Sequence, residues 1–250
     1  MNQVCTFYIF VVCLRQLGDL EISYTCNPKL LQREENEMHN KALYSEILNI
    51  LRPFNVPAGA HNRILNAYCE SWRTYHNADH IIQMLRLSRH TDINLSDEER
   101  QRLELMILYH DVWYKVGRSA GENEKQSAQW AVDDLAGASD ELIRLRRCLQ
   151  QGINATATHS LADTNPVYVD EIATLLDLDL WGLGQEPESF QEDTEKVWQE
   201  YQPIATREEF DNGRSIWAQN FLSSRNQIYF TEPFLDREEM AQRNLKQLVG

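Results

Sequence analysis

The sequence lacks the features that indicate several common classes of protein. Its five cysteines are odd in number, widely spaced and never part of a CxxC pair. This pattern argues against a structural zinc cluster or a disulfide framework and favours a reducing compartment. There is no sustained apolar–polar alternation and no Asn-Gly hairpin between apolar runs, so little β-structure is expected. Internal repeats and long low-complexity segments are absent as well.

Basic residues are scarce too. The chain has 24 Lys and Arg against 38 Asp and Glu, a formal net charge of -14. Such a chain has no electrostatic advantage on nucleic acid or on an anionic membrane, so neither is expected as a main partner. A small anionic ligand is still compatible with this charge, because a few placed arginines bind it locally. Nothing in the sequence indicates an oligomeric state.

The N-terminal apolar run, Val4 to Leu14, is too short to span a bilayer. It resembles the core of a signal peptide but lacks a preceding basic region, and a strand or a non-native extension are the alternatives. We expect residues 1–33 to be a disordered or dispensable extension and the protein to be cytoplasmic. The 250 residues are 42% hydrophobic, enough for one sizeable core.

From about Glu34 onward, almost every segment has helical periodicity and the connections are short. Ser96, followed three residues later by Glu99, forms the capping box typical of a helix start. The sequence therefore predicts one compact all-α domain over residues 34–250. The expected helices cover residues 39–54, 58–72, 78–90, 95–114, 123–135, 139–158, 167–180, 187–201, 207–222 and 236–248.

Charged residues on apolar helix faces are the candidates for chemistry, because burying a charge costs free energy unless it is paired or binds a metal. Asp179 lies on such a face, three residues after Leu176 and four after Leu175. Asp177 points away from that face, and two aspartates two residues apart cannot share a metal from one regular helix. We expect Asp179 to be a metal ligand and Asp177 to flank the ligands, with a capping or solvated role as the alternative for Asp177.

The doublet His110-Asp111 follows a run, Leu105 to Tyr109, that is apolar on every side. A single buried histidine is usually a hydrogen-bonded core residue. An imidazole beside a carboxylate, however, suits a divalent metal. We therefore expect both residues to be ligands.

Two further histidines, His76 and His80, lie four residues apart. His80 starts an inward-facing row with Met84 and Leu87, and His76 precedes it by one turn on the same side. We expect His80 to be a ligand and His76 to lie at the rim, where it contacts substrate or supports a ligand. A purely structural pair is the alternative.

Three more charged residues interrupt apolar faces or end helices. Glu124 is a candidate proton shuttle, and Arg214, between aromatic residues, offers a rigid fork that suits phosphate. Both have the alternative of pairing with other side chains. His159, near a helix C-terminus, is either a cation that satisfies the helix end or an additional ligand.

The ordered residues His80, His110-Asp111 and Asp179 in an all-helical chain resemble the H…HD…D pattern of the HD-domain superfamily. The chain is more specifically similar to the predicted metal-dependent phosphohydrolases of that superfamily, over roughly Tyr44 to Leu248. The motifs that carry the resemblance are YHNADHIIQML, LYHDVWY, NEKQSA, TATH, LLDLDLWGLG, NGRSIWAQNFLSSRNQIYFT and EEMAQRNL. One departure is Lys115, where similar sequences usually have an acidic residue.

The resemblance implies a compact HD-type helical bundle with His80, His110, Asp111 and Asp179 around one divalent metal: manganese, iron, cobalt, nickel, zinc or magnesium. A water activated by the metal would hydrolyse a nucleotide or another small phosphoester. In this hypothesis the other catalytic residues are His76, Glu124 and Arg214.

Two alternatives are open. An HD-fold di-iron oxygenase would use additional histidine ligands, which His159 and His76 would supply. A non-catalytic helical binding module would hold a structural metal in a closed coordination sphere.

Overall fold

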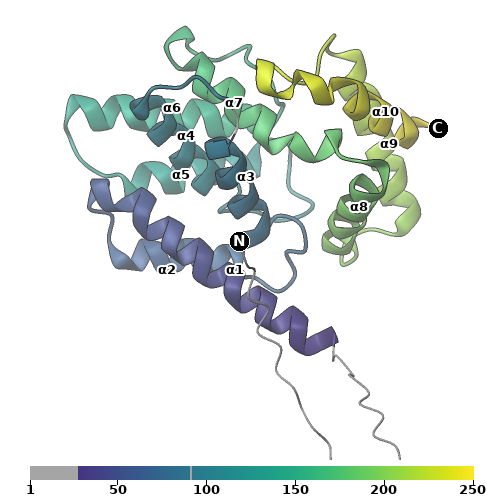
Figure 1. Ribbon diagram of the computed structural model, residues 1–250, viewed down its shortest axis with the longest axis horizontal. Coiled ribbons are helices and arrows are strands. Elements are labelled where there is room, and N and C mark those ends of the chain that lie inside the picture. The colour runs from purple at the N-terminus through teal and green to yellow at the C-terminus, as the bar shows by residue number, and fades with distance from the viewer. Residues whose placement is uncertain (1–27, 91) are drawn as a thin grey trace, which may run out of the picture. The chain divides into compact units, whose positions relative to one another are not determined.

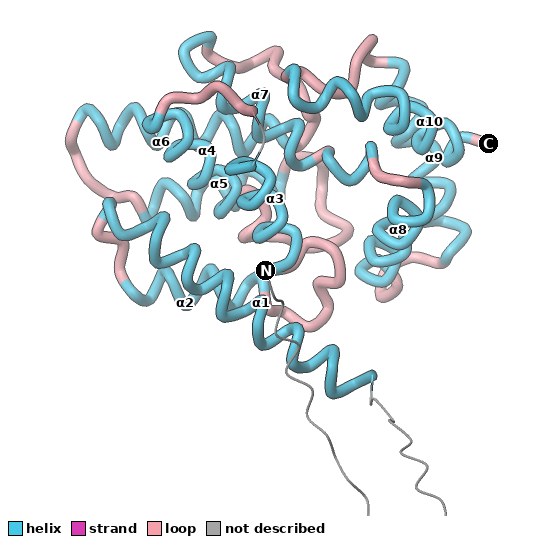
Figure 2. The backbone as a smooth tube through the Cα atoms, viewed as in Figure 1, coloured by secondary structure: helices cyan, strands magenta, loops and turns pink. Residues whose placement is uncertain are grey.

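The computed structural model describes residues 28–90 and 92–250, and in this part of the chain every regular element is helical (Figure 2). The all-α fold class predicted from the sequence is confirmed. None of the helices described is long and apolar enough to cross a membrane. The α-helices are α1 (Pro28–Leu51), α2 (Ala58–Tyr68), α3 (Ala78–His90), α4 (Asp97–Tyr109), α5 (Glu122–Asp134), α6 (Asp140–Thr156), α7 (Val169–Asp179), α8 (Pro187–Tyr201), α9 (Arg207–Ser223) and α10 (Glu238–Val249). Short 3-10 helices, η1 to η4, cover Arg52–Phe54, Pro166–Tyr168, Trp181–Gly184 and Glu232–Arg237.

The chain divides into two compact units, Met1–Met38 and His39–Gly250. Of the first unit, the structure describes only residues 28–38, which form the beginning of α1. Most of the predicted extension, residues 1–33, lies outside the described residues. Its proposed boundary near Glu34 stays a prediction. The site lies wholly within the second unit.

The core of the second unit is built around α4 and α7. Within this unit α4 packs against α3, α5, α6 and α7, while α9 packs against α10 further along the chain (Figure 1). Leu105 to Tyr109 are all buried, so α4 is enclosed on every side near its C-terminus, as the sequence predicts. The C-terminal ends of these two helices, at His110 and Asp179, are largely enclosed within the unit.

The predicted capping box is confirmed: the Ser96 hydroxyl accepts from the Glu99 backbone N–H, and the Glu99 carboxylate accepts from the Ser96 backbone N–H. The far end of the same helix differs from the prediction. The expected helix 95–114 ends at Tyr109, because the chain turns where the Arg73 guanidinium donates to the carbonyls of Asp111 and Val112. This early end places His110 and Asp111 in a turn instead of on a continuous helix.

The first expected helix, 39–54, is longer at its start, since α1 begins at Pro28, and most of the others agree with the structure to within two residues. The helix expected over 58–72 ends at Tyr68, and the one expected over 139–158 ends at Thr156. Both shortened ends lead into loops that carry candidate site residues, His76 and His159.

Candidate metal centre

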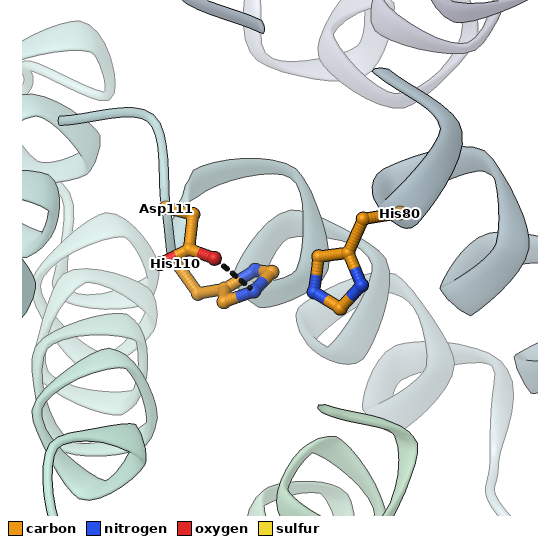
Figure 3. A group of neighbouring side chains, drawn as sticks. All are labelled: His80, His110 and Asp111. Carbon is orange, nitrogen blue, oxygen red and sulfur yellow. Dashed lines mark ion pairs between the residues drawn. The ribbon is translucent and has the colours of Figure 1, made fainter. Parts of the chain in front are cut away.

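The four side chains predicted to be ligands come together from three separate parts of the chain. His80 lies in the first turn of α3, His110 and Asp111 follow α4, and Asp179 is the last residue of α7. Ligand atoms of His80, His110 and Asp111 lie within 4.8 Å of one another, and their side chains point toward a common centre (Figure 3). Asp179 Oδ1 lies 3.3 Å from His80 Nε2 and 3.5 Å from His110 Nε2.

The His110 ring is fixed in one orientation. Its Nδ1 lies 2.9 Å from the Ile107 carbonyl oxygen, which only accepts hydrogen bonds, so Nδ1 carries the proton. Nε2 is then the nitrogen that faces the carboxylates and would bind a metal ion. This Nε2 is buried without a hydrogen-bond partner, 3.1 Å from Asp111 Oδ2, and the buried Nε2 of His80 also has none.

These side chains fit a divalent cation. Imidazole nitrogens and carboxylate oxygens bind such ions at about 2.0–2.2 Å, so two ligand atoms on one ion lie at most about 4.4 Å apart. The 4.8 Å limit of the cluster is close enough for small side-chain rotations to bring the ligands to one ion. His110 and Asp179 also lie at the C-terminal ends of α4 and α7, where the helix dipole favours positive charge.

The electrostatics of the cluster also favour a bound cation. Burial alone would raise the pKa of Asp111 and Asp179, but the neighbouring imidazoles, His110 foremost, outweigh it and hold both pKa values below the usual range. Burial likewise opposes a charge on His110, yet the two carboxylates raise its pKa well above the usual value. The two carboxylates are therefore ionised at neutral pH and favour a positive charge between them.

His159 joins the cluster through Asp179. Its Nε2 lies 2.9 Å from Asp179 Oδ2, and its backbone has a φ of 48°, an uncommon conformation for a residue other than glycine. Arg225 supports this turn by donating to the carbonyls of Thr158 and His159 at 3.0 Å each. His159 thus occupies the second oxygen of Asp179 and leaves Oδ1 facing the other two histidines.

His76 lies beside the cluster and has a partner of its own. Its Nδ1 lies 2.7 Å from Glu200 Oε2, and the backbone N–H groups of Tyr75 and His76 donate to Glu200 Oε1. The His76 ring also stacks on Tyr114, with ring centroids 4.1 Å apart. Burial lowers the pKa of His76, but the hydrogen bond with Glu200 and the charge of Asp111 outweigh it and raise the pKa above its ordinary value.

Glu124 lies within electrostatic reach of Asp111 and Asp179, whereas Arg214 lies among tyrosines that include Tyr75 and Tyr114. Burial is the first cause of the raised pKa of Glu124, and the charges of Asp111 and Asp179 add to it. The Arg214 guanidinium lies 4.5 Å from the Trp217 ring centroid, and its buried Nε has no hydrogen-bond partner. The roles of both residues stay predictions.

Asp177 is the candidate that the structure places elsewhere. Its carboxylate accepts from the backbone N–H groups of Phe230 and Thr231 and from the Thr231 hydroxyl, at 2.6 to 2.8 Å. These contacts connect α7, in which Asp177 is buried, to the segment before η4, and they are neither a helix cap nor solvation. Burial raises the pKa of Asp177 to about 6.

Sequence reasoning missed two residues next to the site, Arg73 and Glu200. The buried Arg73 guanidinium donates to the carbonyls of Asp111 and His76, so it ties together two segments that carry site residues. Arg73 lies in a loop, where no helix face marks it as unusual. Glu200 is one of many acidic residues on α8, although its position three residues after Val197 was a usable signal.

Neither the family models nor the curated proteins searched contain a match to the chain. Among solved structures, the phosphodiesterase domain of the RhoPDE fusion protein from the choanoflagellate Salpingoeca rosetta is similar, with a TM-score of 0.52 and 13% sequence identity. The likeness covers 86% of this chain and 87% of that one. At this identity the likeness shows that the two chains share a helical fold.

Proposed function

We propose that this chain is a metal-dependent phosphoester hydrolase. Its divalent cation, one of manganese, iron, cobalt, nickel, zinc or magnesium, would be held by His80, His110, Asp111 and Asp179. One observation carries the proposal: two buried imidazole nitrogens without hydrogen-bond partners converge with carboxylates at ion-pair distance. The fold shared with a phosphodiesterase domain supports phosphoester chemistry. A nucleotide or another small phosphorylated molecule is the proposed substrate class.

When bound, a divalent cation lowers the pKa of a coordinated water and polarises a phosphoryl oxygen. The protein supplies the fixed ligand geometry. His110 is held by the Ile107 carbonyl and Asp179 by His159, so neither ligand needs to reorient when substrate arrives.

His76 is the proposed proton donor to the leaving oxygen. The Glu200 carboxylate orients Nδ1 and raises the pKa of the ring, so His76 is protonated closer to neutral pH than an ordinary histidine. Nε2 is then the nitrogen that faces away from Glu200 and would donate the proton. Stacking on Tyr114 holds the ring in this orientation.

Arg214 and Glu124 complete the proposed machinery. The Arg214 guanidinium has a buried Nε without a partner and would counter the phosphate charge. Glu124 would orient the attacking water or accept its proton, because burial raises the pKa of its carboxyl toward neutrality.

The test is a screen of the purified, chelator-treated protein with each of the six metals on p-nitrophenyl phosphate and bis(p-nitrophenyl) phosphate. We expect turnover with at least one metal and its loss in Asp179→Asn. The matched control is Asp170→Asn, an exposed aspartate in the first turn of the same helix. Absence of turnover with every metal, together with unchanged metal binding in Asp111→Ala, would refute the proposal. Two irons per chain with oxygen uptake would instead favour the oxygenase alternative.

A further inference from the structure

A cavity of about 220 Å³ adjoins the candidate metal centre on the side of α3 and α8. His80 and Asp179 form part of its wall, so any molecule in the cavity lies next to the proposed cation. The His80 side chain is only 10% exposed, and its Nε2 has no hydrogen-bond partner. The cavity and the metal centre therefore form one continuous site, with room beside the ligands for part of a substrate.

Polar groups converge around Gly182 in the wall of this cavity. A Cβ on Gly182 would lie 3.3 Å from the Tyr75 hydroxyl, 3.4 Å from Gln185 Nε2 and 3.5 Å from Asp193 Oδ2. The absence of a side chain at Gly182 thus leaves a small space bordered by a hydroxyl, an amide and a carboxylate. All four residues line the cavity.

The charge of the cavity wall is negative even without the proposed ligand Asp179. Three other carboxylates, Asp79, Glu192 and Asp193, line it with a single ammonium group, that of Lys196, and the Asp79 carboxylate also pairs with His39. Lys196 Nζ pairs with Asp193 Oδ1 at 2.8 Å. The other oxygen, Asp193 Oδ2, accepts a hydrogen bond from Gln185 and faces the space near Gly182. Glu192 is exposed. Such a wall repels a leaving group that carries extra phosphate or carboxylate and attracts one that carries a cation.

The size of the cavity narrows the substrate further. Sites for drug-sized ligands usually enclose about 300–1,000 Å³, and this cavity is smaller. It suits a leaving group of a few heavy atoms better than a nucleoside. The rings of Tyr75 and Trp181 and the apolar side chain of Met84 provide contact for the carbon part of such a group.

We propose that this cavity binds the leaving group of a small phosphate monoester whose alcohol carries a protonated amine. The inference rests on the proposed hydrolase function and selects within its substrate class. In the reaction, water adds to phosphorus, the P–O bond to the amino alcohol breaks, and the alcohol oxygen takes one proton. The products are the free amino alcohol and inorganic phosphate. The ammonium lies near Asp193 and Glu192, while the phosphoryl group lies at the metal centre.

The test measures binding separately from turnover. The manganese-loaded protein is titrated calorimetrically with three phosphonates of similar size, which are not hydrolysed: 2-aminoethylphosphonate, propylphosphonate and phosphonoacetate. We expect the aminoethyl compound to bind about tenfold more tightly than the propyl compound and phosphonoacetate to bind most weakly. Equal affinities, or tightest binding of phosphonoacetate, would overturn the inference.

Two variants test whether residues of the cavity wall cause the expected differences in binding. Glu192→Gln, which changes an exposed side chain, should reduce the preference for the amine two- to fivefold, about the size of a partly exposed ion pair. Its control, Glu141→Gln, removes the same charge from an exposed position on α6 and should leave the preference unchanged. Gly182→Ala should weaken both the aminoethyl and propyl compounds but not inorganic phosphate. An unchanged preference in Glu192→Gln, together with unchanged affinities of both compounds in Gly182→Ala, would contradict the assignment of the cavity.

Turnover of the matching esters then separates the two proposals. Hydrolysis of 2-aminoethyl, propyl and carboxymethyl phosphate at equal rates, with equal phosphonate binding, overturns the inference and keeps the hydrolase. A clear preference in binding without hydrolysis of any phosphoester overturns the hydrolase and keeps the amine site.

Discussion

Helices α4 and α7 carry two clusters of ionisable groups, one toward each end, and the two clusters differ in what balances their carboxylates. Toward the N-terminal ends, the Arg102 guanidinium pairs with the fully buried Glu171. At the C-terminal ends, His110 lies 3.5 Å from Asp179. Arg102 and His110 are eight residues apart, and so are Glu171 and Asp179, which corresponds to about 12 Å along a helix axis. Because the two contacts occur in the same order along both segments, α4 and α7 run parallel and keep one register.

The comparison shows how one helix pair holds both a structural and a candidate functional cluster. At Glu171 a permanently charged arginine neutralises the carboxylate. Among the residues described, the carboxylates of Asp111 and Asp179 form ion pairs only with histidines, and no lysine or arginine pairs with them. Because an imidazole can give up its proton and a guanidinium cannot, only the second cluster can exchange its positive charge for a metal ion.

The largest expected effect comes from removing a carboxylate of the C-terminal cluster. Asp111→Ala should abolish bound metal and lower phosphoester turnover on the order of 10³-fold, because several kcal/mol of transition-state stabilisation are lost. Metal content by plasma mass spectrometry and kcat/KM are the measurements. A variant that keeps stoichiometric metal and wild-type turnover would show that the two clusters do not differ in the proposed way.

Removing the arginine of the N-terminal cluster should lower the stability of the protein and leave its metal content unchanged. Arg102→Met leaves the buried Glu171 carboxylate without its partner and should lower the free energy of unfolding by about 3 kcal/mol. Urea unfolding measures this change. Metal content per folded chain should stay at the wild-type level, and its loss would indicate that both clusters serve the same site.

A smaller effect is expected from Glu200→Gln, which removes the charge that orients His76. The raised pKa of His76 means that its acid form persists as pH rises and is lost above the folded-state value. The substitution lowers that pKa, so the alkaline limb of the kcat/KM profile should move to lower pH, with a roughly 10- to 100-fold loss of activity.

The control for this substitution is Glu188→Gln, which neutralises an exposed glutamate in the first turn of the same helix, α8. It should keep both the activity and the pH profile of the wild type. A Glu200→Gln profile that loses activity equally at every pH would point to a structural role for the pair.

The smallest effect is expected at the N-terminus of α4. Ser96→Ala removes the helix cap and should lower the free energy of unfolding by about 1 kcal/mol, whereas Ser96→Gly should cost only a few tenths. Metal affinity at the far end of the helix should not change. A change in affinity would mean that the two ends are coupled through α4.

Helical periodicity and the rule against buried charges were sufficient to predict the fold class and to select the four side chains, proposed as ligands, that the structure brings together. The Ser96 cap was predictable because capping depends on neighbouring residues. Asp179 was predictable because its position on an apolar stripe is a local property, and its distance from His110 agrees with a shared ligand role.

Contacts between distant segments were beyond the same reasoning. The early end of α4 depends on Arg73, 38 residues before Asp111 in the chain. The partner of His76 comes from α8, 124 residues later. Asp177 looked like a neighbour of the ligands because only the folded chain brings Thr231 to its carboxylate. The cavity beside Gly182 likewise depends on how α3, η3 and α8 meet.

The most direct test of the metal centre is anomalous diffraction at the manganese edge from crystals grown with manganese. The account predicts one strong peak within about 2.3 Å of the side chains of His80, His110, Asp111 and Asp179. A protein that crystallises in this fold with no peak there, or with manganese bound only elsewhere, would contradict the central claim.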